Sequence, residues 1–163
     1  MRFLISAVAL LFGGLGLAWA QNFSGPGSAL PSAAEFSATL LPEIKGVVSW
    51  KTLAEVTPVR QKDRFVPQFS KSIAELDKKE VRLQGFMMPL DVGEKQARFL
   101  LTAVPPGCAF CLPAGPDALV EVRAKTPLKY GFEPIVVSGK FVVLKDDPMG
   151  LYYRLTDAVP VSQ

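Results

Sequence analysis

The 163-residue sequence contains no histidine. Serine and cysteine triads of the usual kind need an imidazole as general base, so its absence argues against such hydrolases. Covalent haem attachment is excluded as well, because that motif requires a histidine directly after its second cysteine. The sequence also lacks the glycine-rich loop that cradles nucleotide phosphates. These absences favour a binding function over an enzymatic one.

Neither sign of charge dominates the sequence. Eighteen lysines and arginines face 15 aspartates and glutamates, which gives a net charge of +3. Cations and acids are interleaved in residues 60–64 and 77–80. An excess this small does not indicate a polyanionic partner, and we expect no nucleic acid to bind.

Only one apolar run is long, and it lies near the N-terminus. Arg2 precedes the apolar residues 3–17, and residues 18–20 have the small-x-small pattern of an export cleavage site. The run is at the short limit for a bilayer span, so an uncleaved anchor is the alternative. We predict a signal peptide over residues 1–20, cleaved after Ala20, and a soluble periplasmic product without stable membrane insertion.

The rest of the chain is predicted to form a leader and one domain. Residues 21–45 are rich in small and turn-forming residues and are predicted to be a flexible leader. Residues 46–163 are predicted to form a single domain. Residues 49–56 indicate a short helix with Ser49 as N-cap, in which Trp50 anchors the arm to the domain. Residues 72–76 indicate one further helical turn, and the segment around Phe65 and Phe69 is predicted to be irregular.

From residue 80 the pattern changes to short strands, predicted at residues 81–90, 97–104, 119–122, 135–144 and 151–155. Gly85 and Gly139 are places where strongly curved strands can bend. The fold class is therefore mainly β, a small five-stranded OB-like barrel with a short N-terminal helical arm, and a split sandwich is the alternative. Stacking surfaces for a ligand such as a saccharide are expected from four aromatic residues, Phe99, Phe141, Tyr152 and Tyr153.

Both cysteines of the chain, Cys108 and Cys111, lie in a proline-rich loop between the second and third predicted strands. An oxidising compartment favours a disulfide between them. A ring this small contributes about 2 kcal/mol at most in the chain-entropy model. Thiol–disulfide exchange is a second alternative, but the prolines that follow argue against the helix that would activate a thiolate.

Metal binding is the third alternative for the two thiols. Without histidine, tetrahedral zinc would need carboxylates such as Asp117 or a second protomer. Monovalent copper accepts soft sulfur ligands, and Met87 and Met149 are candidate further ligands beside the cysteines. The cofactor, if any, is therefore expected to be Cu(I) or Zn(II). The loop could also dock on a partner through Pro105, Gly107, Phe110 and Pro113.

The chain from about residue 50 to 157 resembles a family of exported bacterial proteins catalogued as domain of unknown function 3299. The resemblance rests on Trp50 with Leu53, on Val-x-Leu-x-Gly-Phe-Met-x-Pro-Leu at residues 81–90, on the cysteine loop, and on residues 137–139 and 151–154. Many relatives look like Cys-x-His at the loop, where this chain has Cys108, Phe110 and then Cys111. The resemblance implies an exported OB-like domain, in some members encoded near membrane transport systems, with no established reaction.

These observations predict a soluble periplasmic accessory or binding protein that presents a Cys-x-x-Cys loop. It would handle a thiophilic metal or dock on an envelope protein or transport system. The alternatives are a thiol–disulfide exchange factor and a domain in which the disulfide of Cys108 and Cys111 is only structural.

Overall fold

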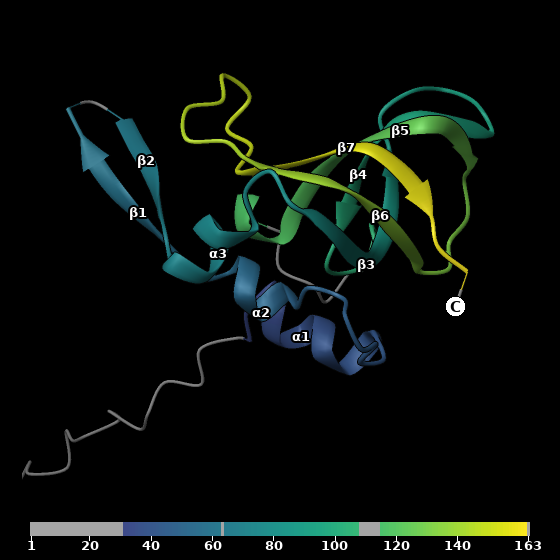
Figure 1. The fold of residues 1–163 in the computed structure, drawn as a ribbon, viewed down its shortest axis with the longest axis horizontal. Coiled ribbons are helices and arrows are strands. Elements are labelled where there is room, and N and C mark those ends of the chain that lie inside the picture. The colour runs from purple at the N-terminus through teal and green to yellow at the C-terminus, as the bar shows by residue number, and fades with distance from the viewer. Residues whose placement is uncertain (1–30, 63, 108–114, 163) are drawn as a thin grey trace, which may run out of the picture. The chain divides into compact units, whose positions relative to one another are not determined.

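A closed five-stranded β-barrel is the centre of the computed structural model, which describes residues 31–62, 64–107 and 115–162 (Figure 1). Its strands are β3 (Glu80–Pro89), β4 (Lys95–Thr102), β5 (Leu119–Lys129), β6 (Ile135–Val143) and β7 (Tyr153–Pro160). Their order around the barrel is β3-β4-β5-β7-β6. All neighbours are antiparallel except β5 and β7, which run parallel. The predicted mainly-β, OB-like barrel is thereby confirmed.

Strand β3 closes the barrel because its first part pairs with β6 and its second part pairs with β4. Residues 80–85 pair with β6, and residues 86–89 pair with β4. The change of partner falls at Gly85, where a Cβ atom would lie 2.6 Å from the carbonyl oxygen of Thr102. At Gly139 a Cβ atom would lie 2.7 Å from the carbonyl oxygen of Thr156. Both glycines allow a neighbouring strand to approach more closely than any side chain would permit.

Alternate residues of each strand point into the barrel and form its core. Phe99, Phe141, Tyr153 and Leu155 are all fully buried there, and the rings of Phe141 and Tyr153 stack with their centroids 5.4 Å apart. The prediction that Phe99, Phe141 and Tyr153 offer stacking surfaces for a ligand is therefore wrong. Because side chains of a strand point alternately inward and outward, these rings lie on the inner face of the barrel. Other core side chains cover them there, so they are not accessible to a ligand.

Helix α2 (Trp50–Leu53) fastens the N-terminal arm to the barrel, and Ser49 is its N-cap as predicted. Trp50 is buried and its indole Nε1 donates a hydrogen bond to the backbone oxygen of Gln84 at 2.8 Å. The hydroxyl of Tyr153 donates to the backbone oxygen of Leu53 at 2.6 Å. Burial is the main cause that raises the pKa of the Tyr153 phenol, with the charge of Asp117 adding to it.

Strands β5 and β7 extend further than predicted, to Lys129 and Pro160, and α2 ends at Leu53, short of the predicted residue 56. Three further elements also differ from the sequence-based expectations. Helix α1 (Ala33–Leu40) is held by a capping box between Ser32 and Glu35, so part of the predicted leader is helical and buries Ala34. Helix α3 (Lys71–Leu76) begins earlier than predicted because Ser70, whose hydroxyl accepts from the backbone nitrogen of Ile73, is its N-cap.

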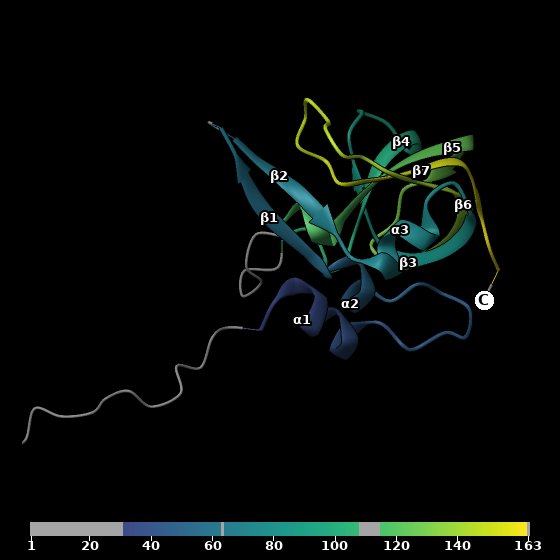
Figure 2. The same ribbon diagram turned by 60° about the vertical axis from the view of Figure 1, so that its left-hand side comes forward.

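The third difference is a β-hairpin formed by β1 (Val56–Gln61) and β2 (Arg64–Phe69), where an irregular segment was predicted. Pro58 and Pro67 lie opposite each other in its register. A two-stranded hairpin tolerates proline, since each strand keeps one unpaired edge. The hairpin projects from the helical arm (Figure 2). Among the described residues, no helix has the length and apolar character needed to cross a membrane.

Candidate functional site

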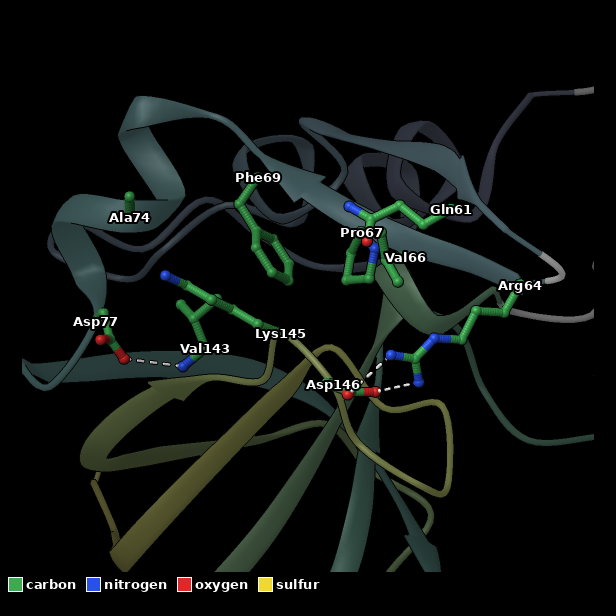
Figure 3. Close-up of a pocket in the computed structure, with 10 residues that line it drawn as sticks. All are labelled: Gln61, Arg64, Val66, Pro67, Phe69, Ala74, Asp77, Val143, Lys145 and Asp146. Atoms are coloured by element: carbon green, nitrogen blue, oxygen red, sulfur yellow. Dashed lines mark hydrogen bonds and ion pairs between the residues drawn. The ribbon is translucent and has the colours of Figure 1, made fainter.

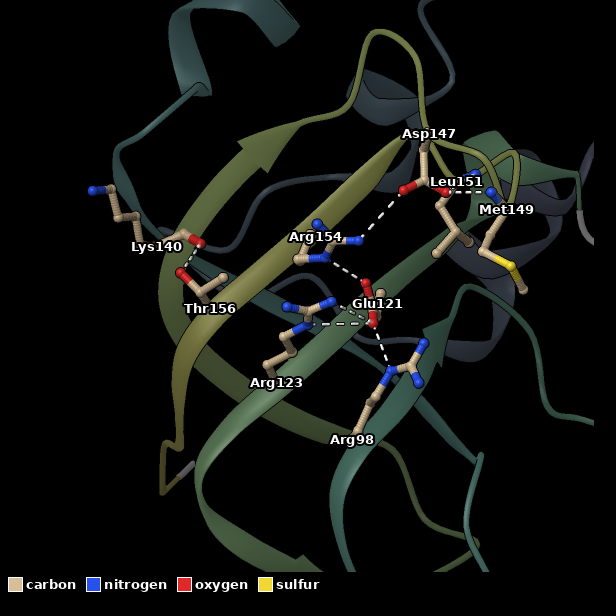
Figure 4. Close-up of polar contacts among 9 residues, drawn as sticks. All are labelled: Arg98, Glu121, Arg123, Lys140, Asp147, Met149, Leu151, Arg154 and Thr156. Atoms are coloured by element: carbon tan, nitrogen blue, oxygen red, sulfur yellow. Dashed lines mark hydrogen bonds and ion pairs between the residues drawn. The ribbon is translucent and has the colours of Figure 1, made fainter.

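A buried carboxylate lies on the outer side of the barrel wall. Glu121 of β5 alternates with the core residues Val120 and Val122, so its side chain points away from the barrel interior. Its side chain is nevertheless 0% exposed. Figure 4 shows the reason: three arginines, one from β5 itself and two from the neighbouring strands β4 and β7, converge on this one carboxylate and cover it.

The three arginines divide the two oxygens of Glu121 between them. Arg98 of β4 donates its Nε–H to Oε1 at 2.7 Å. Arg154 of β7 donates its Nε–H to Oε2. Arg123, two residues further along β5, donates to Oε1 from Nε at 3.4 Å and from Nη2 at 3.3 Å. The carboxylate is thus fully surrounded by charged donors.

Strand register explains why the acid lies at this position. Arg98 and Arg123 are directly opposite each other on β4 and β5, and like charges in that arrangement repel. Glu121 lies on the same face of β5 and is directly opposite Arg154 on β7. One carboxylate therefore offsets the repulsion among three guanidinium groups.

The pKa of Glu121 reflects this competition. Burial by itself raises the pKa, because it disfavours the charged form. Hydrogen bonds from Arg154 and Arg98, together with the charges of Arg154 and Arg123, outweigh burial and hold the pKa of this carboxyl below its ordinary value. Glu121 is therefore a permanent anion at neutral pH, which suits an anchor for arginines rather than a proton donor.

The loop between β6 and β7, residues 144–152, extends the cluster. Asp147 accepts from Nη2 of Arg154 at 3.4 Å, and its other oxygen accepts from the backbone nitrogens of Met149 and Leu151. The neighbouring Asp146 forms a bidentate pair with Arg64 of the hairpin, at 2.8 and 3.1 Å. This loop is thus tied to the barrel on one side and to the hairpin on the other.

A cleft of about 550 Å³ lies between the hairpin and this loop (Figure 3). Val66 and Phe69 supply apolar walls, and Lys145 and the Arg64–Asp146 pair supply charge. Asp77 also lines the cleft, where its carboxylate accepts from the backbone nitrogen of Val143 at 3.0 Å. The cleft shares the β6–β7 loop with the arginine cluster.

We call the outward side of β4, β5 and β7 at this point the basic face, made of Arg98, Arg123 and Arg154 around Glu121 and Asp147. Three cations and two carboxylates leave it a net charge of +1. The side chains of Arg98 and Arg123 are 51% and 52% exposed. Because each guanidinium has five N–H donors, several donors of these two arginines face solvent. The face can therefore bind carboxylate or phosphate groups.

The structure describes only some of the site residues that the sequence predicts. Cys108, Cys111, Phe110 and Pro113 lie outside the described residues, so the metal, disulfide and exchange hypotheses for that loop stay predictions. Pro105 is half-buried, and Gly107 is exposed with a φ of +85°.

The two methionines proposed as further metal ligands lie in contrasting environments. Met87 is 2% exposed and belongs to the barrel core, whereas Met149 is 76% exposed in the β6–β7 loop. Within the ranges that the structure describes, no group of three or more acidic, cysteine or histidine side chains could hold a metal ion.

Sequence reasoning missed Glu121 and its arginines. The available signal was an acidic residue flanked by valines in a predicted strand, at 119–122, which is unusual unless the acid is paired. Arg123 is only two residues from it, but the other two arginines that pair with it, Arg98 and Arg154, lie 23 and 33 residues away in the sequence. Only the strand register brings them together.

The strand order and the parallel β5–β7 pair define the class of this protein: a small OB-type barrel with a helical arm and a basic outer face. The family model described as protein of unknown function DUF3299 matches residues 42–154, and the chain belongs to this family. A crystal structure of a DUF3299 family protein from Pseudomonas aeruginosa PAO1 is similar at 23% sequence identity. That similarity has a TM-score of 0.47 and covers 60% of this chain and 68% of that chain. No curated protein matches the chain.

Proposed function

We propose that this chain is an exported accessory protein that binds an acidic segment of an envelope protein through its basic face. The observation that carries the proposal is the convergence of Arg98, Arg123 and Arg154 on the single buried carboxylate of Glu121. The carboxylates of Glu121 and Asp147 neutralise only two of the three guanidinium charges, so the cluster keeps a net positive charge. Here solvent-facing guanidinium donors remain for a partner.

The position of the basic face within the fold supports a binding role. OB-type barrels commonly bind extended ligands on their second and third strands and on the loop between the fourth and fifth. Those elements correspond here to β4, β5 and the β6–β7 loop. Arg98, Arg123 and Asp147 lie on these elements. The fold indicates only where a ligand would bind. The chemistry of that ligand has to be inferred from the side chains.

The residues favour carboxylates over nucleic acid. Single-stranded nucleic acids bind barrels of this type by stacking bases on exposed aromatic rings. Phe99, Phe141 and Tyr153 are instead buried in the barrel. Planar guanidinium groups pair with carboxylates through two parallel hydrogen bonds, which gives an acidic peptide segment a directional contact.

A synthetic decaglutamate peptide is a suitable probe. We expect the purified full chain to bind it saturably at low salt. The double variant Arg98→Gln/Arg123→Gln should weaken binding at least tenfold and reduce its salt dependence. Arg82→Gln is the matched control, because Arg82 is an exposed arginine on β3. Equal binding by the double variant and the control would overturn the proposal, and tighter binding of oligo-dT than of decaglutamate would replace it with a nucleic-acid function.

The cysteine pair forms the second part of the proposal, and it rests on the sequence alone. We propose that Cys108 and Cys111 handle a thiophilic metal or contribute to docking, with thiol–disulfide exchange as the alternative. Under reducing conditions the full chain should bind about one equivalent of Cu(I) or Zn(II), and Cys108→Ser should abolish this. Disulfide-reductase turnover without metal binding would favour the exchange factor.

A further inference from the structure

Two apolar side chains lie on the outer side of the barrel wall beside the basic face. Strand pairing places Met88 of β3 directly opposite Leu100 of β4, and Leu100 directly opposite Glu121 of β5. Residues that are directly opposite each other in paired strands point to the same face of the sheet. Because the Glu121 side chain points away from the barrel interior, those of Leu100 and Met88 do so too. We call these two residues the apolar pair.

Burial agrees with this orientation of the apolar pair. The neighbours of the pair along the two strands, Met87, Phe99 and Leu101, are at most 2% exposed and belong to the barrel core. Met88 and Leu100 are half-buried, and they belong neither to the core nor to the apolar residues packed against it. Covering their remaining apolar surface is favourable, so it suits an apolar group of a partner.

Arg98 brings a carboxylate-binding group next to the apolar pair. It lies on the same face of β4 as Leu100, because Phe99 between them points inward. Its Nε donates to Glu121, and its two Nη atoms, which are turned away from that carboxylate in Figure 4, form no hydrogen bond within the described residues. The basic face has a net charge of +1, so one further carboxylate would balance it.

Strand geometry sets the spacing between these two contacts. Residues two positions apart in a strand are separated by about 6.6 Å, which is therefore the separation of Arg98 and Leu100 along β4. An extended peptide has the same repeat. When one of its carboxylates lies over Arg98, the side chain two positions away lies over Leu100, and the side chain one position away points in the opposite direction.

We propose that the basic face and the apolar pair together recognise an extended segment in which an acidic and an aliphatic residue are two positions apart. Arg98 and Arg123 bind the carboxylate, and Leu100 and Met88 cover the aliphatic side chain. This inference rests on the proposed function and adds to it the residue pattern of the partner.

Two synthetic peptides of identical composition and charge test the pattern. Three repeats of Glu-Ser-Leu-Ser place the glutamate and leucine side chains on one side of an extended chain, whereas three repeats of Glu-Leu-Ser-Ser place them on opposite sides. In titration calorimetry at low salt, we expect the full chain to bind the first peptide at least tenfold more tightly than the second. This comparison uses the parent chain, so no folding defect of a variant affects it.

Variants of the apolar pair locate the effect. Leu100→Ser should reduce the preference to less than twofold, whereas Leu100→Met keeps an apolar side chain and should retain it. Val159→Ser is the matched control, since Val159 is 38% exposed at the opposite end of β7 from Arg154, and it should leave the preference unchanged.

Two results would overturn the inference: equal affinity of the parent chain for the two peptides, and a preference that survives Leu100→Ser. Binding of decaglutamate separates this failure from a failure of the proposed function. If the parent chain binds decaglutamate but does not distinguish the two peptides, only the aliphatic contact is wrong. If it binds neither decaglutamate nor the two peptides, the proposed function is wrong and the inference falls with it.

Discussion

The two faces of the barrel wall use the same strands for different purposes. On the inner face, Val120, Val122 and Leu155 are fully buried among other apolar side chains. On the outer face, one residue away in sequence, Glu121, Arg123 and Arg154 form a charged cluster. Both faces bury side chains, but one does so by apolar packing and the other by pairing charges.

This difference indicates which face mainly stabilises the fold and which face is available for binding a partner. Apolar packing is non-directional and roughly proportional to buried area, so it stabilises whichever side chains fill the barrel. A buried ion pair gains little net stability over apolar residues of similar volume. The arginine cluster therefore adds little to the stability of the fold, and we infer that its role is to recognise a partner. Variants of each face, compared with matched controls, test this division.

The largest effect is expected from the inner face. Phe141→Ala removes a fully buried ring that stacks on Tyr153, and we expect it to lower the free energy of unfolding by about 3–5 kcal/mol. Phe132→Ala is the control, since Phe132 is 84% exposed and should change stability by at most about 0.5 kcal/mol. Urea denaturation measures both. Similar losses for the two variants would show that the barrel interior does not dominate stability.

A glycine at the barrel wall should give the next largest effect. Gly139→Ala would place a Cβ atom 2.7 Å from the Thr156 carbonyl oxygen and 3.1 Å from the Cα atom of Ala158. Forcing β6 and β7 apart should cost about 1–3 kcal/mol. Gly131→Ala meets no atom within 4 Å and should cause no loss of stability. Thermal unfolding distinguishes them, and an unchanged midpoint for Gly139→Ala would mean that the strands separate freely.

Much of this inner architecture was predictable from sequence, because it depends on local patterns. Alternation and the glycines at residues 85 and 139 gave the five strands and their closure. The hairpin of β1 and β2 was not predicted, since Pro58 and Pro67 usually interrupt strands. Helix α1 was overlooked because the small residues around Ala33 resemble a linker, although Ser32 and Glu35 form a capping box.

The outer face should respond less strongly and in a pH-dependent way. Glu121→Gln leaves Arg98 and Arg154 without their anion, and we expect a loss of about 1–2 kcal/mol at pH 7, limited because Arg98 is half-exposed to solvent. The folded-state pKa of Glu121 is lowered, so its stabilising contribution is present above the unfolded-state pKa, about 4.3, and is lost as pH falls through the folded pKa. The difference between variant and parent should therefore shrink on acidification.

Urea denaturation between pH 7 and pH 3 measures this prediction. Glu75→Gln is the control, since Glu75 forms only an exposed pair with Lys71 at 3.8 Å and should change stability by less than about 0.5 kcal/mol. The difference in the free energy of unfolding between Glu121→Gln and the parent should decrease below pH 4. If it stayed constant or increased, the lowered pKa of Glu121 would be contradicted.

Little of the outer face could be predicted from sequence. The cysteine loop attracted attention because Cys108 and Cys111 are close in the chain, and local spacing is what sequence shows directly. The basic face depends on register: Arg98 meets Arg123 and Glu121 meets Arg154 only after the barrel has closed. Its partners come from three strands, so no local motif marks it.

The smallest effect on stability is expected where the β6–β7 loop meets the hairpin. Arg64 and Asp146 form a bidentate pair, but both side chains are 64% exposed, so Asp146→Asn should lower global stability by less than about 1 kcal/mol. Local effects should be larger, because this pair ties the hairpin to the loop across the cleft. Hydrogen exchange of the β1 and β2 amides should therefore accelerate, while exchange in β5 and β7 stays unchanged.

Arg64→Gln should reproduce this pattern, and the double variant should add little, since either change removes the same interaction. Concentrated salt should produce the same acceleration in the parent chain by screening the pair. If Asp146→Asn instead lowered global stability as much as Gly139→Ala does, the hairpin would belong to the cooperative unit of the barrel. The exposed charges at Asp146 and Arg64 would then stabilise the whole fold, and the division between an apolar inner face that stabilises and a charged outer face that recognises would fail at this loop.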